Sequence, residues 1–183
     1  MLDFSYNGFG RNGDSWWYCR GGKVQFDDNG VIEGTVNGTY GWWKVVNSQV
    51  IFDNDVCANA SGWWKITNGK VDFDYTGLAQ NACGWWMIQN GHVNFGSNGL
   101  VDNGNGWWLV KNGCVDFNYN GLVDNGNGWW LIRNGYVDFN YNGLVDNGNG
   151  WWLVKNGCVD FSYQGYVQNE CGVWWVSNGQ VQF

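Results

Sequence analysis

A repeated string of about 22 residues constrains this chain more than any other feature. The string GWWLVKNGCVDFNYNGLVDNGN at residues 106–127 recurs with few changes at 128–149 and 150–171. All 16 Trp residues form eight adjacent pairs, whose first members are separated by 26, 21, 22, 22, 22, 22 and 23 residues. A fixed period of this size is typical of solenoids and propellers, in which each repeat is too short to bury a core without its neighbours.

The interior of each repeat predicts β-structure. WWLV and CVDFNY are short β-prone runs separated by Lys-Asn-Gly, and Asn-Gly between two such runs is the strongest local hairpin signal. No segment shows helical periodicity. We therefore expect an all-β chain, a β-hairpin repeat solenoid of about eight 22-residue hairpin units joined by Gly/Asn loops. A closed ring of hairpins is the alternative, because the first residues duplicate the strand type on which the last ones end.

The repeats are less regular toward the ends of the chain. Residues 1–61 are expected to form irregular N-terminal capping repeats, residues 62–171 five regular 22-residue repeats, and residues 172–183 a C-terminal half-repeat. Terminal repeats of such arrays are atypical because they cap the stack. All three segments are expected to form one continuous repeat domain.

Successive side chains of a strand point to opposite faces, and this alternation assigns the two Trp of each pair. The position two residues after the second Trp is mostly β-branched, whereas the position one residue after it admits Lys44 and Lys65. We predict that the second Trp faces the core and that the first Trp shares the face that tolerates Lys. In the second strand, Val115, Phe117 and Tyr119 share one face, which is expected to be core.

Charge and apolar content exclude several classes of function. A net charge of -7 opposes binding to nucleic acid, whose affinity comes mainly from Lys and Arg. No apolar run approaches the roughly 18 residues of a membrane helix, so no membrane insertion is expected. Six Cys without a CxxC motif fit oxidised extracellular pairing better than zinc binding. We expect disulfides of undetermined connectivity, with unpaired buried thiols or bonds between molecules as the alternatives. We also expect an extracellular location, either secreted or attached to the cell surface.

No set of residues predicts catalysis or a resident cofactor. The carboxylates are evenly repeated, do not converge on one pocket, and no nucleophile is paired with a base. The DNGNG loops at Asp102, Asp124 and Asp146 offer oxygens in the manner of a calcium loop, but Asx turns explain them equally well. We therefore expect a protein that is not an enzyme, with no metal and no cofactor.

The first Trp of each pair and the Asp of each Val-Asp-Phe are the candidate ligand-binding residues. Flat indole faces suit sugar rings or a quaternary ammonium group, and repetition adds avidity for a polymer. The candidates are Trp63, Trp85, Trp107, Trp129, Trp151, Asp72, Asp116, Asp138 and Asp160. The alternative is that these Trp only seal one repeat against the next.

The order Gly-Trp, Asn-Gly turn, aromatic-containing second strand and Gly with an apolar pair resembles the choline-binding and glucan-binding repeats of Gram-positive surface proteins. The longer string GWWxVxNGxVDFxYxGL resembles aromatic tandem cell-wall-binding repeats of gut Firmicutes, over about residues 15–183. The resemblance implies a hairpin solenoid with the leading Trp in an aromatic cage. Those repeats carry aromatic residues where this chain has Val115-Asp116-Phe117, so we expect a glycan in preference to choline.

The expected function is that of a non-catalytic carbohydrate-binding repeat module. Such a module would tether a secreted protein to an envelope polysaccharide, or a related polymer, through Trp-lined seams. The alternative is a structural stalk, fibre or adhesin scaffold that self-associates or contacts a host protein. In that alternative the Trp pairs are purely structural.

Overall fold

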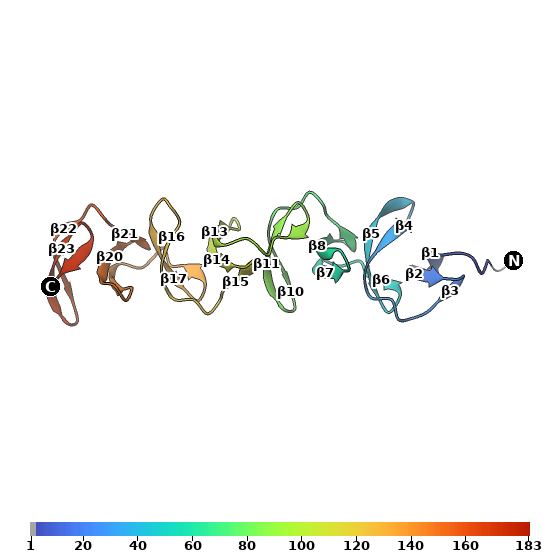
Figure 1. The fold of residues 1–183 in the computed structure, drawn as a ribbon, viewed down its shortest axis with the longest axis horizontal. Coiled ribbons are helices and arrows are strands. Elements are labelled where there is room, and N and C mark those ends of the chain that lie inside the picture. Colours follow the sequence, from blue (N-terminus) through green and yellow to red (C-terminus); the bar gives the residue numbers. More distant parts are fainter. Residues whose placement is uncertain (1–2) are drawn as a thin grey trace. The chain divides into compact units, whose positions relative to one another are not determined.

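The computed structural model describes residues 3–183, so the first two residues of the expected N-terminal cap lie outside the described part of the chain. All regular elements among these residues are β-strands, as expected (Figure 1). No helix that could cross a membrane is found in residues 3–183. The chain divides into two compact units, the first ending at Gly96 and the second beginning at Ser97.

Short antiparallel strands build both compact units. The strands of the first unit are β1 (Gly8–Asn12), β2 (Ser15–Arg20), β3 (Lys23–Val24), β4 (Gly30–Val36), β5 (Thr39–Val46), β6 (Gln49–Val50), β7 (Asp55–Asn59), β8 (Gly62–Thr67), β9 (Lys70–Val71), β10 (Gly77–Asn81), β11 (Gly84–Gln89) and β12 (His92–Val93). The strands of the second unit are β13 (Gly99–Asp102), β14 (Trp107–Lys111), β15 (Cys114–Val115), β16 (Gly121–Asp124), β17 (Trp129–Arg133), β18 (Tyr136–Val137), β19 (Gly143–Asp146), β20 (Trp151–Lys155), β21 (Cys158–Val159), β22 (Gln164–Asn169), β23 (Gly172–Ser177) and β24 (Gln180–Gln182).

Three strands pair in sequence order within each regular repeat. The predicted hairpin is confirmed: β17 pairs with β18, with Ile132 opposite Val137. Its turn residues Asn134 and Gly135 have φ values of 50° and 77°, as a two-residue type I′ turn requires. The Gly-Leu-Val-Asp segment, which lies where the sequence predicts a Gly/Asn loop between hairpins, is instead the strand β16, paired with β17. The DNGNG segment is therefore the tip of a longer hairpin.

The second strand of the predicted hairpin is shorter than expected. In the repeat at 106–127 it ends at Val115, because the Asp116 carboxylate accepts the N–H of Asn118 at 3.2 Å. The Asp116 carbonyl also accepts the N–H of Tyr119 at 3.3 Å and closes a turn. Phe117 lies in this turn and is 40% exposed. The prediction that it shares a core face with Val115 is wrong, because strand alternation stops at the turn.

The core lies at the interface between consecutive repeats, here called a seam. At one seam Leu131 packs with Val154 of the next repeat, and both side chains are buried. Trp129 and Trp152 flank this contact, from the first and second repeat respectively. The N–H of Leu131 also donates to the carbonyl of Gly157 at 2.8 Å. Each repeat thus obtains its core from its neighbour, as the repeat length predicts.

Both faces of the central strand are buried, which corrects one prediction. The second Trp does share the β-branched face, but the face that tolerates Lys also meets a neighbouring repeat. Lys44 on that face is only 9% exposed, and its ammonium lies 2.8 Å from Asp53 and 2.6 Å from Asp55. The two Trp of a regular pair, such as Trp129 and Trp130, are both half-buried. The division into one inward and one outward Trp is therefore wrong.

The described strand pairings form an open succession of hairpins. β1 pairs with β2, whereas β24 pairs with β23 and β20. Closure into a ring would instead pair the first strand with the last hairpin, so the closed-ring alternative is wrong.

The expected disulfides are not present among residues 3–183. In the second compact unit, Cys114 and Cys158 occupy equivalent positions two repeats apart, in β15 and β21. Each of these strands pairs with the central strand of its own repeat. Repetition therefore separates the equivalent thiols instead of placing them opposite one another.

We expect Gly135→Ala to destabilise the second compact unit. A Cβ at Gly135 would lie 2.5 Å from the Asp116 carbonyl oxygen, at a φ of 77°. Gly126 is the matched control: its φ is 84°, but nothing lies within 4 Å of an added Cβ. Strain alone should make Gly126→Ala cost about 1 kcal/mol, and the clash should make Gly135→Ala cost roughly 2 kcal/mol more. Urea unfolding followed by Trp fluorescence measures both, and equal losses would contradict the close packing of this turn.

Candidate functional site

Three aromatic side chains meet at each regular seam, and we call this group an aromatic triad. It contains the first Trp of one repeat together with the second Trp and the Phe of the next repeat. The described triads are Trp42–Trp64–Phe73, Trp63–Trp86–Phe95, Trp107–Trp130–Phe139, Trp129–Trp152–Phe161 and Trp151–Trp174–Phe183. In the last triad the first Trp of its pair, Trp174, takes the place of the second Trp. In the first four the two indole centroids lie 4.9–5.3 Å apart, so these triads are closed by direct ring contact.

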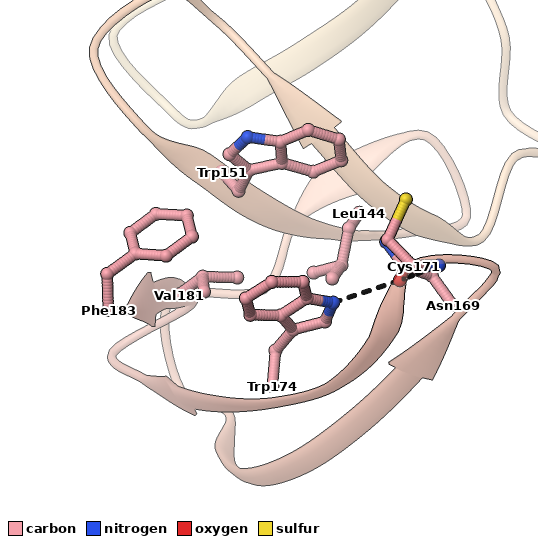
Figure 2. Close-up of a pocket in the computed structure, with 7 residues that line it drawn as sticks. All are labelled: Leu144, Trp151, Asn169, Cys171, Trp174, Val181 and Phe183. Atoms are coloured by element: carbon pink, nitrogen blue, oxygen red, sulfur yellow. Dashed lines mark hydrogen bonds between the residues drawn. The ribbon is translucent and has the colours of Figure 1, made fainter.

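The last triad is open and encloses a pocket of about 240 Å³ (Figure 2). Trp151 of β20 and Trp174 of β23 form two walls, and Phe183 forms a third beside them. The rings of Trp174 and Phe183 are 5.5 Å apart, whereas Trp151 contacts neither ring in the described residues. Leu144 and Val181 complete the apolar lining. We call this cavity the open pocket.

The tip of hairpin β22–β23 supplies the polar edge of the open pocket. The Asn169 side-chain oxygen accepts the indole N–H of Trp174 and the backbone N–H of Cys171, both at 2.9 Å. These bonds fix the orientation of the Trp174 ring and occupy the amide oxygen. Cys171 is exposed and lines the same pocket. The lining thus offers aromatic faces, one amide and one thiol, but no charged side chain.

A second hollow, here called the tip groove, lies between two successive hairpin tips of the second compact unit. Its volume is about 540 Å³, and Trp107 is its one aromatic lining residue. The other lining residues are Asn98, Gly99, Leu100, Asp102, Asp124, Asn125 and Asn127. The lining of the tip groove is therefore mixed, and it is much more polar than that of the open pocket.

The five Trp predicted as binding residues occupy different environments. Trp63 and Trp129 lie in closed triads. Trp107 also belongs to a closed triad, but it borders the tip groove. Trp151 lines the open pocket, and Trp85 is half-buried in β11. The structure therefore brings only Trp107 and Trp151 of these five to a described cavity.

The four Asp predicted to flank the Trp row are engaged elsewhere, and none lines the open pocket or the tip groove. Three form ion pairs and one accepts a hydroxyl hydrogen bond: Asp116 with Lys111 at 2.9 Å, Asp138 with Arg133 at 3.3 Å, Asp160 with Lys155 at 2.8 Å, and Asp72 with Thr67 at 3.1 Å. Their role as ligand-binding residues stays a prediction.

The cations of these ion pairs also cover the Tyr rings of their own repeats. The ammonium of Lys111 lies 4.3 Å from the centre of the Tyr119 ring, and Lys155 lies at the same distance from Tyr163. The hydrogen bond from Lys155 holds the pKa of Asp160 below its usual value. The Tyr faces are therefore occupied by the protein's own cations, while no Lys or Arg lines the open pocket.

Sequence reasoning missed several residues of the open pocket. Trp174 is the first Trp of its pair, yet Val173 holds the corresponding position and is 61% exposed. Trp174 instead matches the second Trp of other repeats, because its indole bonds Asn169 as the indole of Trp86 bonds Asn81. The signal was the Asn five residues before the Trp in each case. The Phe wall had a signal too, since a Phe follows two residues after the second-strand Val in most repeats.

Comparison with solved structures finds three chains of low sequence identity and low TM-score that match most of this chain. Choline binding protein F from Streptococcus pneumoniae is 18% identical over 94% of this chain and 58% of that chain, with a TM-score of 0.38. A complex of CbpF with ipratropium is 17% identical over 94% of this chain and 60% of that chain, with a TM-score of 0.38. Alternansucrase in complex with isomaltononaose is 14% identical over 97% of this chain and 15% of that chain, with a TM-score of 0.36. The chain thus spans less than two thirds of each of these proteins.

No relative was found among curated proteins. The choline-binding repeat family matches six segments, which are residues 5–25, 53–72, 74–94, 96–116, 118–138 and 140–160. These segments cover more than half of the sequence. The chain therefore belongs to the choline-binding repeat family.

Proposed function

We propose that this chain is a non-catalytic binding module that holds a quaternary ammonium group, such as choline, in the open pocket. The observation that carries the proposal is the pocket itself, in which Trp151, Trp174 and Phe183 surround about 240 Å³ without a charged side chain. A cation over an aromatic face gains about 0.5–2 kcal/mol per contact. Methyl groups on the nitrogen suit the apolar lining, and the net charge of -7 favours a cationic ligand.

The chemistry of the open pocket favours this ligand over a sugar. A pyranose ring needs several hydrogen-bonding partners, because each desolvated hydroxyl without a partner is unfavourable. The Asn169 oxygen already accepts two hydrogen bonds, and the Cys171 thiol is a weak donor. The Val-Asp-Phe segment, from which the sequence favours a glycan, contributes the Phe of three of the four closed triads, and Val181-Gln182-Phe183 contributes the Phe of the open pocket. The aromatic walls of a cage are therefore present.

The proposed biological role is to tether a secreted protein to an envelope polymer that carries ammonium groups. Membership of the choline-binding repeat family supports this role. The closed triads repeat the same three residue types, and they would add further sites if their rings moved apart. Linked sites raise the effective concentration of a polymeric ligand.

A structural role is the second candidate for the closed triads. The indole rings of Trp129 and Trp152 lie 4.9 Å apart, which leaves no room for a ligand between them. Trp129 therefore packs the seam in the present arrangement, as the scaffold alternative expects. The open pocket is the feature that a scaffold does not require.

We expect Phe183→Leu to weaken choline binding by roughly 2- to 30-fold, because one cation–π contact is lost. Phe183 is 87% exposed, so the change should leave the fold intact. Tyr166→Leu is the matched control, since Tyr166 is 71% exposed and contacts Trp175 outside the pocket. Isothermal titration of the full chain with choline chloride measures both affinities. Equal losses of choline affinity in the two variants, or no choline binding by the unaltered protein, would contradict the proposal.

The Cys171 thiol provides a second test, because it lines the open pocket. A thiosulfonate carrying a trimethylammonium group should modify Cys171 several times faster than Cys83, and free choline should slow only the reaction of Cys171. Cys83 is the matched control: it is exposed at the same position of its hairpin tip, with its N–H bonded to Asn81 at 2.9 Å. Uncharged methyl methanethiosulfonate should modify both thiols at similar rates. Peptide mass spectrometry follows the reactions, and equal rates with the charged reagent would contradict a preformed ammonium site.

A further inference from the structure

The tip groove carries chemistry that the open pocket lacks. It is more than twice as large, about 540 Å³ against about 240 Å³. Its lining combines the Trp107 indole with two carboxylates, Asp102 and Asp124, and three side-chain amides. Both carboxylates are exposed at the groove. An aromatic surface beside several planar polar groups is suited to a ligand with one apolar face and many hydroxyls.

Each carboxylate of the tip groove keeps one oxygen for a ligand. One oxygen of Asp102 accepts the N–H of Gly104, and one oxygen of Asp124 accepts the N–H of Gly126, both at 2.8 Å. These bonds form Asx turns that hold the side chains in place. Neither carboxylate forms an ion pair with any Lys or Arg in residues 3–183, in contrast to Asp160 with its partner Lys155.

The amides supply the complementary donors. The side-chain oxygen of Asn125 accepts the N–H of Asn127 at 3.0 Å. The oxygen of this amide is thus used within the turn, and its NH₂ group can donate to a ligand. Asn127 is exposed at the tip. The groove thus offers acceptors for hydroxyl hydrogens and donors for hydroxyl oxygens within one cavity.

We infer that the tip groove binds a neutral sugar ring of a glycan chain. The apolar face of a pyranose would pack on the Trp107 indole, and its hydroxyls would donate to Asp102 and Asp124 and accept from the amides. A phosphorylated or uronic sugar would be repelled by the two carboxylates. A quaternary ammonium group has no hydrogen bonds to offer to the amides. The tip groove therefore recognises a different chemistry from the open pocket, and the inference goes beyond the proposed function.

The residue types of the tip groove recur one repeat further along. Asp124, Trp129 and Asp146 follow Asp102, Trp107 and Asp124 at intervals of 22 residues. Asp146 also accepts a tip N–H, from Gly148 at 2.9 Å. In the first compact unit the residues paired with the first Trp are Arg11, Glu33, Ala58 and Gln80, so among the described pairings two successive carboxylates at this position occur only at the DNGNG tips.

Indole N–H signals of the ¹⁵N-labelled full chain test the inference. The probes are isomaltotetraose, chitotetraose and choline chloride, and Trp107→Phe assigns the Trp107 signal. At least one oligosaccharide should shift the Trp107 signal while leaving Trp151 and Trp174 in place, and choline should do the reverse. If neither oligosaccharide shifts the Trp107 signal at millimolar concentration, the inference is overturned. If choline does not shift the Trp151 signal, only the proposed function is overturned.

The double variant Asp102→Asn, Asp124→Asn is the sharper test. Asn retains the oxygen that accepts the turn N–H, so the tips should keep their conformation. Loss of the charge-assisted hydrogen bonds should weaken oligosaccharide binding at Trp107 about three- to tenfold, with the choline response unchanged. The control variant Asp14→Asn, Asp74→Asn removes the same charge from exposed residues outside the groove. Unaltered oligosaccharide affinity in the groove variant, or an equal loss in the control, overturns the inference.

Discussion

The contact between the Leu face of one repeat and the β-branched face of the next is the interaction on which this structure depends. Leu131 and Val154 meet in this way, and both are buried. A repeat of about 22 residues cannot bury these side chains within itself, so the seam is its core. The Trp pairs stand at the edges of the seam. The distance between the indole rings therefore decides whether a Trp seals the seam, as Trp129 does, or lines a pocket, as Trp151 does.

Most of the fold could be predicted from the periodicity of the sequence. The Trp spacing predicted a repeat array, and Asn134-Gly135 predicted the tight turn that the structure has. The strand β16 could not be recognised in the same way, because its four residues stand between a Gly/Asn turn and the DNGNG tip. Its identity comes from pairing with β17, where Val123 lies opposite Trp130. Pairing across a hairpin tip depends on residues outside the strand, so the composition of the strand alone does not predict it.

Less of the candidate site than of the fold could be predicted from the sequence, for two physical reasons. The sequence predicts strand alternation past Val159 and its equivalents, but an Asx turn ends the strand there and directs the following Phe to the triad. The sequence also predicts that the Asp of the same segment binds ligand together with the first Trp of each pair. The Asn-Gly turn brings Lys155 within 2.8 Å of Asp160, five residues away, and an ion pair is the stronger partner. Short turns therefore place the Phe in the triad and the Asp beside a Lys, which strand alternation alone does not predict.

The placement of the protein's own cations divides its aromatic surfaces into rings that a cation covers and rings that none covers. Lys111 and Lys155 are held over Tyr119 and Tyr163 by the same short turn that pairs them with Asp. An ammonium ligand would have to displace a tethered cation from a Tyr face, whereas the open pocket around Trp151 contains none. In the two proposals, the surroundings of each Trp determine the ligand class. Apolar walls favour a methylated cation, and the carboxylates and amides around Trp107 favour hydroxyl groups.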